Sequence, residues 1–184
     1  MTKCSVFIAT SLDGFIARPD GDFTWLDTSA PHIEGEDYGF AEFYSSIDGL
    51  VMGRKTYETA LGFPEWPYAG KRLVVLSNSS ILIPPHLAKD VEQMSASPHE
   101  VVRQLELTGA SHLYVDGGLT IQGFLSVGLI NEITMTTIPI LLGSGIPLFG
   151  PLERDILLQI ISSRSYPNGF VQTKYIISHS IPAD

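Results

Sequence analysis

Short runs of apolar, β-branched residues alternate along the chain with segments whose apolar residues recur every three or four positions. The first pattern is typical of strands buried on both faces of a sheet, and the second of amphipathic helices. We therefore predict strands at residues 4–10, 50–53, 71–77, 91–95, 112–115 and 133–142, and helices at residues 36–47, 55–61, 97–108 and 119–127. This alternation predicts an α/β fold with a mostly parallel sheet flanked by helices.

The last third of the chain has a different pattern. Two strand-like segments, 157–165 and 170–178, flank Tyr166-Pro167-Asn168-Gly169, which has the composition of a hairpin turn. Pro139 lies inside the segment 133–142, which predicts either an edge strand or a strand with a break. We expect a single domain over residues 1–184, with a mixed sheet that ends in an antiparallel C-terminal hairpin.

Composition and charge argue against several classes of function. The chain has 184 residues, 44% of them hydrophobic, and a net charge of −9, which argues against binding to nucleic acid. No apolar run is long enough to cross a membrane and no signal peptide is recognisable, so we expect a cytoplasmic protein without a membrane partner. Cys4 is the single cysteine, and the five histidines lack ligand spacing, so no metal site is expected.

Two junctions between a strand and a helix contain the residues expected to bind a ligand. Gly53 ends one strand and is followed by Arg54, and Gly117-Gly118 ends another. Glycine allows a ligand to approach the backbone, a helix N-terminus presents free N–H groups, and arginine offers a forked donor to an anion. The polar cluster 77–80 (SNSS) follows a third strand. The alternatives are a tight turn with solvated basic residues and a plain polar turn.

Asp37 is a candidate functional carboxylate. On a helix over residues 36–47, Asp37 shares a face with Phe40 and Tyr44, so we expect its side chain to point inward. The alternative is that Asp37 caps the helix N-terminus in water. If the helical register shifts by one residue, Glu36 takes the inward position instead of Asp37. Asp13, in a turn, has the ordinary role of a turn former.

These motifs together resemble a known family. Residues 51–58 (VMGRKTYE), 75–77 (VLS) and Gly117-Gly118 follow the order and spacing of dihydrofolate reductases, including a first strand followed by a loop with Trp25. Residues 11–14 (SLDG), 114–118 (YVDGG) and 139–149 (PILLGSGIPLF) are similar to the stand-alone relatives of the riboflavin-pathway reductase domain. The resemblance covers most of the chain.

The resemblance implies an NADPH site and assigns residues to it. Those expected to contact the cofactor are Ala9, Ile16, Gly53, Arg54, Lys55, Thr56, Leu76, Ser77, Asn78, Gly117, Gly118, Thr120, Ile121 and Gln122. Asp37 is the expected catalytic residue, and the substrate is expected to contact Asp13, Trp25, Phe40 and Lys71. The resemblance further implies a cis peptide between Gly117 and Gly118.

The implied activity is hydride transfer from NADPH to a small heterocycle, of the 5-amino-6-(5-phosphoribosylamino)uracil reductase type. Two alternatives stay open: dihydrofolate reduction, and a nucleotide-binding module without turnover. Folate enzymes place an arginine where this chain has Lys71, and lysine cannot grip a carboxylate with a bidentate fork. A homodimer through the apolar C-terminal strands is also expected.

Overall fold

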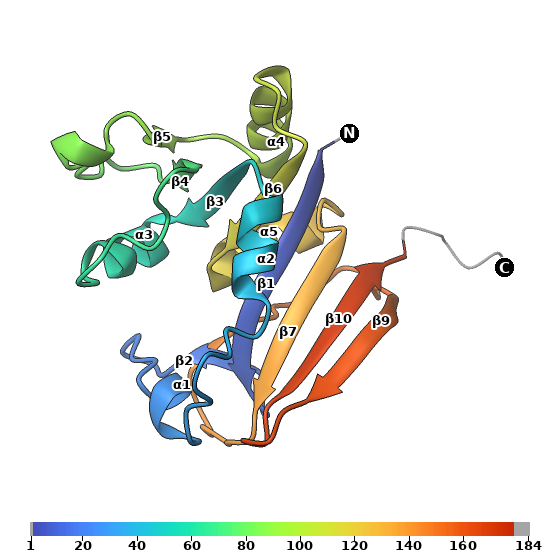
Figure 1. The fold of residues 1–184 in the computed structure, drawn as a ribbon. Helices are drawn as coiled ribbons and strands as arrows, with labels where there is room; N and C mark the ends of the chain where they lie inside the picture. Colours follow the sequence, from blue (N-terminus) through green and yellow to red (C-terminus); the bar gives the residue numbers. More distant parts are fainter. Residues whose placement is uncertain (1, 179–184) are drawn as a thin grey trace, which may run out of the picture.

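An eight-stranded mixed sheet forms the centre of the computed structural model, which describes residues 2–178 (Figure 1). In sheet order the strands are β5 (Val91–Met94), β4 (Arg72–Leu76), β3 (Gly49–Gly53), β6 (His112–Asp116), β1 (Lys3–Ser11), β7 (Glu132–Ile138), β10 (Val171–Ile177) and β9 (Leu158–Ser165). The first six are mutually parallel, whereas β10 is antiparallel to both of its neighbours. The predicted fold class, with its C-terminal hairpin, is confirmed.

Helices cover both faces of the parallel part of the sheet. They are α1 (Trp25–Thr28), α2 (Phe40–Ser46), α3 (Arg54–Leu61), α4 (Pro98–Leu107) and α5 (Gly118–Ser126), with a 3₁₀ turn, η1, at Pro85–Leu87. In β3, Val51 belongs to the core under α4 and α5, whereas Leu50 and Met52 belong to the core under α2 and α3. Because both faces are covered, successive residues of β3 are all apolar, which explains the continuous runs in the sequence.

The start of α4 follows its sequence signals closely. Pro98 is the first helical residue, and the Ser97 side chain accepts a hydrogen bond from the Glu100 backbone N–H. The Glu100 carboxylate in turn accepts one from the Ser97 backbone N–H at 2.8 Å, which completes a capping box. The prediction of this helix start is confirmed.

The start of α2 differs from the prediction. The helix begins at Phe40 rather than at residue 36, because Tyr38 and Gly39 adopt left-handed backbone conformations with φ of 57° and 81°. The Asp37 side chain is exposed, and its oxygens accept hydrogen bonds from the Gly39 and Ala41 N–H groups, both at 2.9 Å. The prediction that Asp37 points inward is therefore wrong, and its carboxylate instead satisfies free N–H groups at the helix start.

The loops after β1 and β7 pair with each other. β7 ends at Ile138, directly before Pro139, and lies inside the sheet between β1 and β10, so the proline marks a break and not an edge strand. Beyond it, β8 (Ile146–Pro147) pairs with β2 (Phe15–Ala17) in a separate two-stranded sheet. This small sheet, which we did not predict, fixes the loop that follows β1.

Helix α5 offers a direct test of the core. Phe124 has no exposed area, whereas Leu119 on the same helix is 79% exposed. Phe124→Ala should lower the free energy of unfolding by about 3–5 kcal/mol, because it removes buried apolar atoms and leaves a cavity. Leu119→Ala is the matched control and should change it by less than about 0.5 kcal/mol. Urea unfolding of both variants measures the difference, and equal losses would contradict this account of the core.

Candidate functional site: the carboxyl edge of the parallel strands

The residues predicted to bind a cofactor lie along one edge of the sheet. Because β1, β3, β4 and β6 are parallel, their carboxyl ends share this edge. β3 and β6 are direct neighbours, so the two strand–glycine–helix junctions come together even though more than sixty positions separate them in the sequence. This edge is where ligands bind in open α/β sheets.

The first turns of α3 and α5 touch each other. A Cβ atom on Gly117 would overlap Thr56 Oγ1, and one on Gly53 would lie 3.0 Å from Thr120 Oγ1. Neither helix has a side-chain cap, so the free N–H groups of both helix starts are directed to the same region. Two such N-termini beside glycine backbone form a cradle suited to a pyrophosphate.

The peptide between Gly117 and Gly118 is trans, since residues 2–178 contain no cis peptide bond. The predicted cis peptide is therefore wrong. The chain turns instead through the positive φ of Gly117, 87°, which a residue with a side chain rarely adopts. The Gly117 carbonyl then accepts a hydrogen bond from the Ile121 N–H at 2.9 Å, as the first bond of α5.

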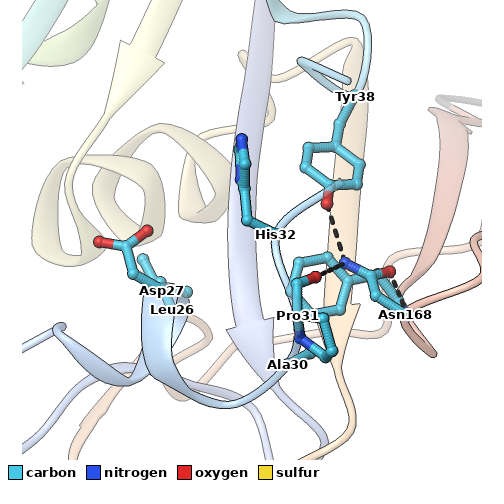
Figure 2. A pocket seen from close by; sticks show the side chains of 8 residues that line it. Leu26, Asp27, Ala30, Pro31, His32, Tyr38 and Asn168 are labelled. Carbon is cyan, nitrogen blue, oxygen red and sulfur yellow. Dashed lines mark hydrogen bonds between the residues drawn. The ribbon is translucent and has the colours of Figure 1, made fainter. Parts of the chain in front are cut away.

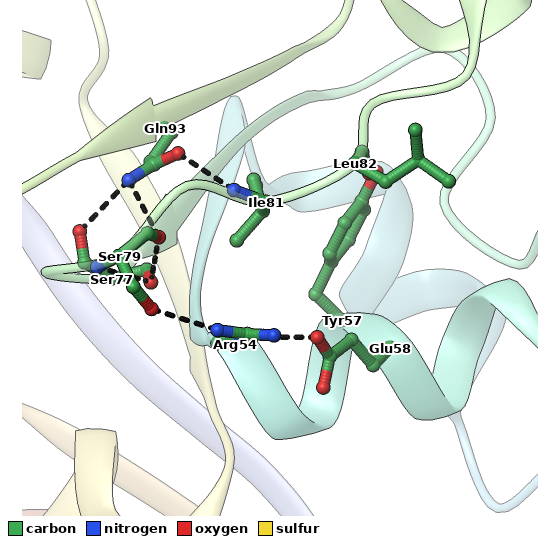
Figure 3. Close-up of polar contacts among 8 residues, drawn as sticks. All are labelled: Arg54, Tyr57, Glu58, Ser77, Ser79, Ile81, Leu82 and Gln93. Atoms are coloured by element: carbon green, nitrogen blue, oxygen red, sulfur yellow. Dashed lines mark hydrogen bonds and ion pairs between the residues drawn. The ribbon is translucent and has the colours of Figure 1, made fainter.

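Arg54, the first residue of α3, extends from the cradle toward the loop after β4 (Figure 3). Its Nη1 donates to Ser79 Oγ at 2.7 Å and its Nε donates to the Glu58 carboxylate at 2.6 Å. A cation in the first turn opposes the helix dipole, and this first turn contains no acidic residue. Helix stability therefore does not explain the arginine, whereas an anionic ligand would.

The loop that contacts Arg54 is shaped by a residue that the sequence analysis missed. Gln93 of β5 donates through Nε2 to the Ser77 and Ser79 carbonyls, both at 3.0 Å, and accepts from the Ile81 N–H at 3.1 Å (Figure 3). Asn78 is held from the same side, since its Oδ1 accepts from Ser95 Oγ at 2.7 Å. Glutamine in a strand carries no sequence signal for such a role.

The remaining predicted cofactor residues differ in what they contact. Ile16 reaches the cradle, because a Cβ on Gly118 would lie 3.0 Å from its Cδ1. Ile121 has no exposed area and packs in the core, so only its backbone can face a cofactor. Gln122 donates to the Pro147 and Leu148 carbonyls and thereby holds β8 against α5. The others are the exposed Lys55 and the partly buried Ala9 and Leu76.

Asp13 connects the two loops that form the small sheet. Its carboxylate accepts hydrogen bonds from Ser11 Oγ at 2.6 Å, Leu142 N at 3.1 Å and Gly143 N at 2.7 Å. These bonds, that from the Ser11 hydroxyl above all, lower the pKa of the Asp13 carboxyl. The carboxylate predicted to contact substrate is thus occupied in joining loops of the protein.

The other predicted substrate residues have different surroundings. Lys71 Nζ donates to the Ile47 carbonyl after α2 and lies 5.5 Å from the centre of the Tyr44 ring, so its charge is engaged within the protein. Phe40 is half-buried against Phe7. Trp25 is 2% exposed, and its indole Nε1–H has no hydrogen-bond partner among residues 2–178. A buried donor without a partner is available to a ligand or a water molecule.

A separate cavity of about 260 Å³ lies between the loop after α1 and the turn between β9 and β10 (Figure 2). Its lining residues are Leu26, Asp27, Ala30, Pro31, His32, Tyr38, Asn168 and Phe170. The Tyr38 hydroxyl accepts from Asn168 Nδ2 at 2.9 Å, and the Tyr38 carbonyl accepts from Gln172 Nε2 at 2.9 Å. This volume is below the roughly 300–1,000 Å³ of sites for drug-sized ligands, so the cavity does not fit a dinucleotide.

Asp116, the last residue of β6, is the carboxylate at this edge that the sequence analysis did not single out. It accepts hydrogen bonds from the Tyr68 hydroxyl at 3.1 Å and from the Gly117 N–H at 2.8 Å. Burial raises the pKa of the Asp116 carboxyl, and the hydrogen bonds from Gly117 and Tyr68 only partly oppose this shift. An aspartate directly before a glycine pair at a strand end was the available sequence signal.

The sheet order and the cradle at its carboxyl edge define a reductase-type α/β domain with the dihydrofolate reductase fold. The family model described as RibD C-terminal domain matches residues 2–172, and the chain belongs to this family. The described residues contain no helix with the length and apolar character needed to cross a membrane.

Similar proteins agree with this assignment. Uncharacterized protein YwjB of Bacillus subtilis is 33% identical over 95% of this chain and 97% of its own length. A putative riboflavin biosynthesis protein from Shewanella sp. PV-4 is 40% identical, with a TM-score of 0.91 over 97% of this chain and 100% of that one. A deaminase/5-amino-6-(5-phosphoribosylamino)uracil reductase from Thermotoga maritima, 15% identical, shares the fold with a TM-score of 0.72 over 96% of this chain and 57% of that one.

Asp116 should make stability depend on pH in a specific direction. Its pKa in the folded protein lies above its ordinary value of 3.8, so the folded state binds this proton more tightly than the unfolded state does. That contribution is present below the ordinary pKa and is lost as the pH rises through the folded pKa. Asp116→Asn should therefore gain stability relative to the wild type as the pH rises above the ordinary pKa of 3.8, measured by urea unfolding at several pH values.

Asp48→Asn is the control, because its stability relative to the wild type should change with pH in the opposite direction. The Asp48 carboxylate accepts hydrogen bonds from Ser111 and His112, and the Ser111 hydroxyl contributes most to lowering its pKa. This contribution to stability is present above the ordinary pKa and is lost on acidification, so Asp48→Asn should become less stable relative to the wild type as the pH rises. The same trend in both variants would contradict the assigned environments.

Proposed function

We propose that this protein is an NADPH-dependent reductase that transfers hydride to a small heterocyclic substrate of the 5-amino-6-(5-phosphoribosylamino)uracil type. The observation that carries the proposal is the convergence of two uncapped helix starts, α3 and α5, beside Arg54 at one edge of the sheet. Family membership and the names of the Shewanella and Thermotoga relatives support the same class of reaction.

The residues present fit a dinucleotide phosphate. Gly117 and Gly118 leave room where side chains would collide with Thr56 or Ile16, and the N–H groups of both helix starts would hold the pyrophosphate. Arg54, together with the Ser77–Ser80 loop, would hold the additional phosphate that distinguishes NADPH from NADH. NADPH supplies the hydride when bound, and the protein supplies position and electrostatic environment.

On the substrate side we replace Asp37 by Asp116 as the carboxyl group that faces the heterocycle. Asp116 lies beside the cradle, and a carboxyl group whose pKa is raised by burial is suited to holding or exchanging a proton. The unpartnered Trp25 indole N–H offers a second polar contact. Dihydrofolate is a weaker candidate, because Lys71 Nζ donates to the Ile47 carbonyl and a lysine ammonium lacks the bidentate fork with which arginine grips a carboxylate.

We further propose that the protein forms a homodimer through β9. All eight residues of this strand are exposed, and no strand within residues 2–178 pairs with the outer side of β9. The sheet face that contains Leu158 and Ile160, 43% and 60% exposed, carries no charge in β9 or β10. A second copy presents the same surface, and an uncharged face lets two acidic chains approach each other.

The cofactor assignment is tested by fluorescence titration with NADPH and NADH. We expect the wild type to bind NADPH more tightly, and Arg54→Ala to weaken NADPH binding about ten- to a hundredfold, because charge-assisted hydrogen bonds to a phosphate are lost. NADH binding should change much less. Arg103→Ala, at an exposed position on α4, is the control and should change neither affinity.

Two outcomes would overturn the assignment. Binding of neither nucleotide by the wild type would mean that the junctions are only turns. If NADPH binds, a substrate panel follows, with dihydrofolate and 5-amino-6-(5-phosphoribosylamino)uracil as the principal members. Oxidation of NADPH by none of the panel would leave a nucleotide-binding module and refute the reductase proposal.

The dimer is tested by light scattering after gel filtration. The wild type should have a mass of twice 20.1 kDa, and Ile160→Lys should reduce it to 20.1 kDa, because two buried ammonium groups would face each other across the two-fold axis. Leu107→Lys is the control, since Leu107 is 77% exposed at the end of α4. A monomeric wild type would refute the proposed interface.

A further inference from the structure

Within residues 2–178, Glu58 is the one carboxylate that contacts the predicted phosphate-binding arginine. It lies one helical turn after Arg54 on α3, and its Oε1 accepts a hydrogen bond from Arg54 Nε at 2.6 Å (Figure 3). The neighbouring Arg54 Nη1 is bonded to Ser79 Oγ at 2.7 Å. The guanidinium is therefore held at two of its three nitrogens, between a negative side chain and a neutral hydroxyl.

The order of the two residues, basic before acidic, is the less favourable one for the helix. An acidic residue at the start of a helix and a basic residue one turn later would suit the helix dipole, whereas Arg54 and Glu58 have the reverse arrangement. Both side chains are close to half exposed, 45% and 48%, so the pair contributes little to stability. A role in helix stability does not account for Glu58 at this position.

We propose that Glu58 is a specificity-determining residue, which weakens the preference of this site for a nucleotide that carries an additional phosphate over one that lacks it. The inference rests on the proposed function, because it requires a nucleotide phosphate at Arg54. A phosphate dianion that binds Arg54 comes close to the Glu58 carboxylate and is repelled by it. A nucleotide with a free ribose hydroxyl at the same place experiences no such repulsion.

The charge of Glu58 can be separated from its hydrogen bond. In Glu58→Gln the amide oxygen can still accept from Arg54 Nε, so the guanidinium keeps its orientation while the negative charge is lost. Glu58→Ala removes both the charge and the hydrogen bond. In each variant Ser79 continues to hold Arg54 through Nη1. The comparison therefore tests repulsion and not orientation.

The experiment measures the affinities of NADPH and NADH for the wild type, Glu58→Gln and Glu58→Ala by calorimetry at low and high salt. Glu58→Gln should bind NADPH about tenfold more tightly at low salt, with NADH affinity unchanged within about twofold. The gain should shrink at high salt, because exposed charges are screened. Glu65→Gln, outside α3, controls for the overall change in net charge.

The outcomes separate this inference from the proposed function. An unchanged or lower NADPH/NADH ratio in Glu58→Gln, with both nucleotides still bound by the wild type, would overturn the role of Glu58 alone. Binding of neither nucleotide by the wild type would overturn the proposed function and this inference together. A gain in Glu58→Gln that Glu65→Gln reproduces would show an effect of net charge and would also refute the specific role of Glu58.

Discussion

The parallel pairing of β3 with β6 is the constraint on which the rest of the site depends. It brings Gly53 and Gly117 to the same edge of the sheet, and the helices that follow them start side by side. A register shift of one residue would turn every side chain of either strand to the other face. Each face packs against its own set of side chains, so close packing on both faces fixes the register, and the register fixes the cradle.

A second set of contacts encloses this edge from the side of β1. Asp13 joins the loop after β1 to the segment at Leu142 and Gly143, and Gln122 joins β8 to α5. The small sheet of β2 and β8 therefore lies against the start of α5, where Ile16 approaches Gly118. Asp13 and Gln122, which were predicted to contact substrate and cofactor, are thus bonded within the protein and form the sides of the site. Few of the predicted polar contacts remain free for a ligand.

The sequence predicted features that depend on local chemistry and missed those that depend on tertiary contacts. The glycine junctions and the Ser97 capping box are encoded within a few residues, and both were predicted correctly. The inward direction of Asp37 required a helix start at residue 36, which the left-handed residues before α2 prevent. Gln93 can hold the loop after β4 only because β5 lies beside β4, and no pattern in the sequence predicts that pairing.

The cradle itself contains an electrostatic conflict. The starts of α3 and α5 are both positive ends of helix dipoles, neither has a side-chain cap, and Arg54 adds a full positive charge at the same place. Like charges at one position destabilise the folded protein unless an anion neutralises them. The proposed nucleotide phosphate would supply the missing negative charge, and within the described protein only the Glu58 carboxylate does so in part.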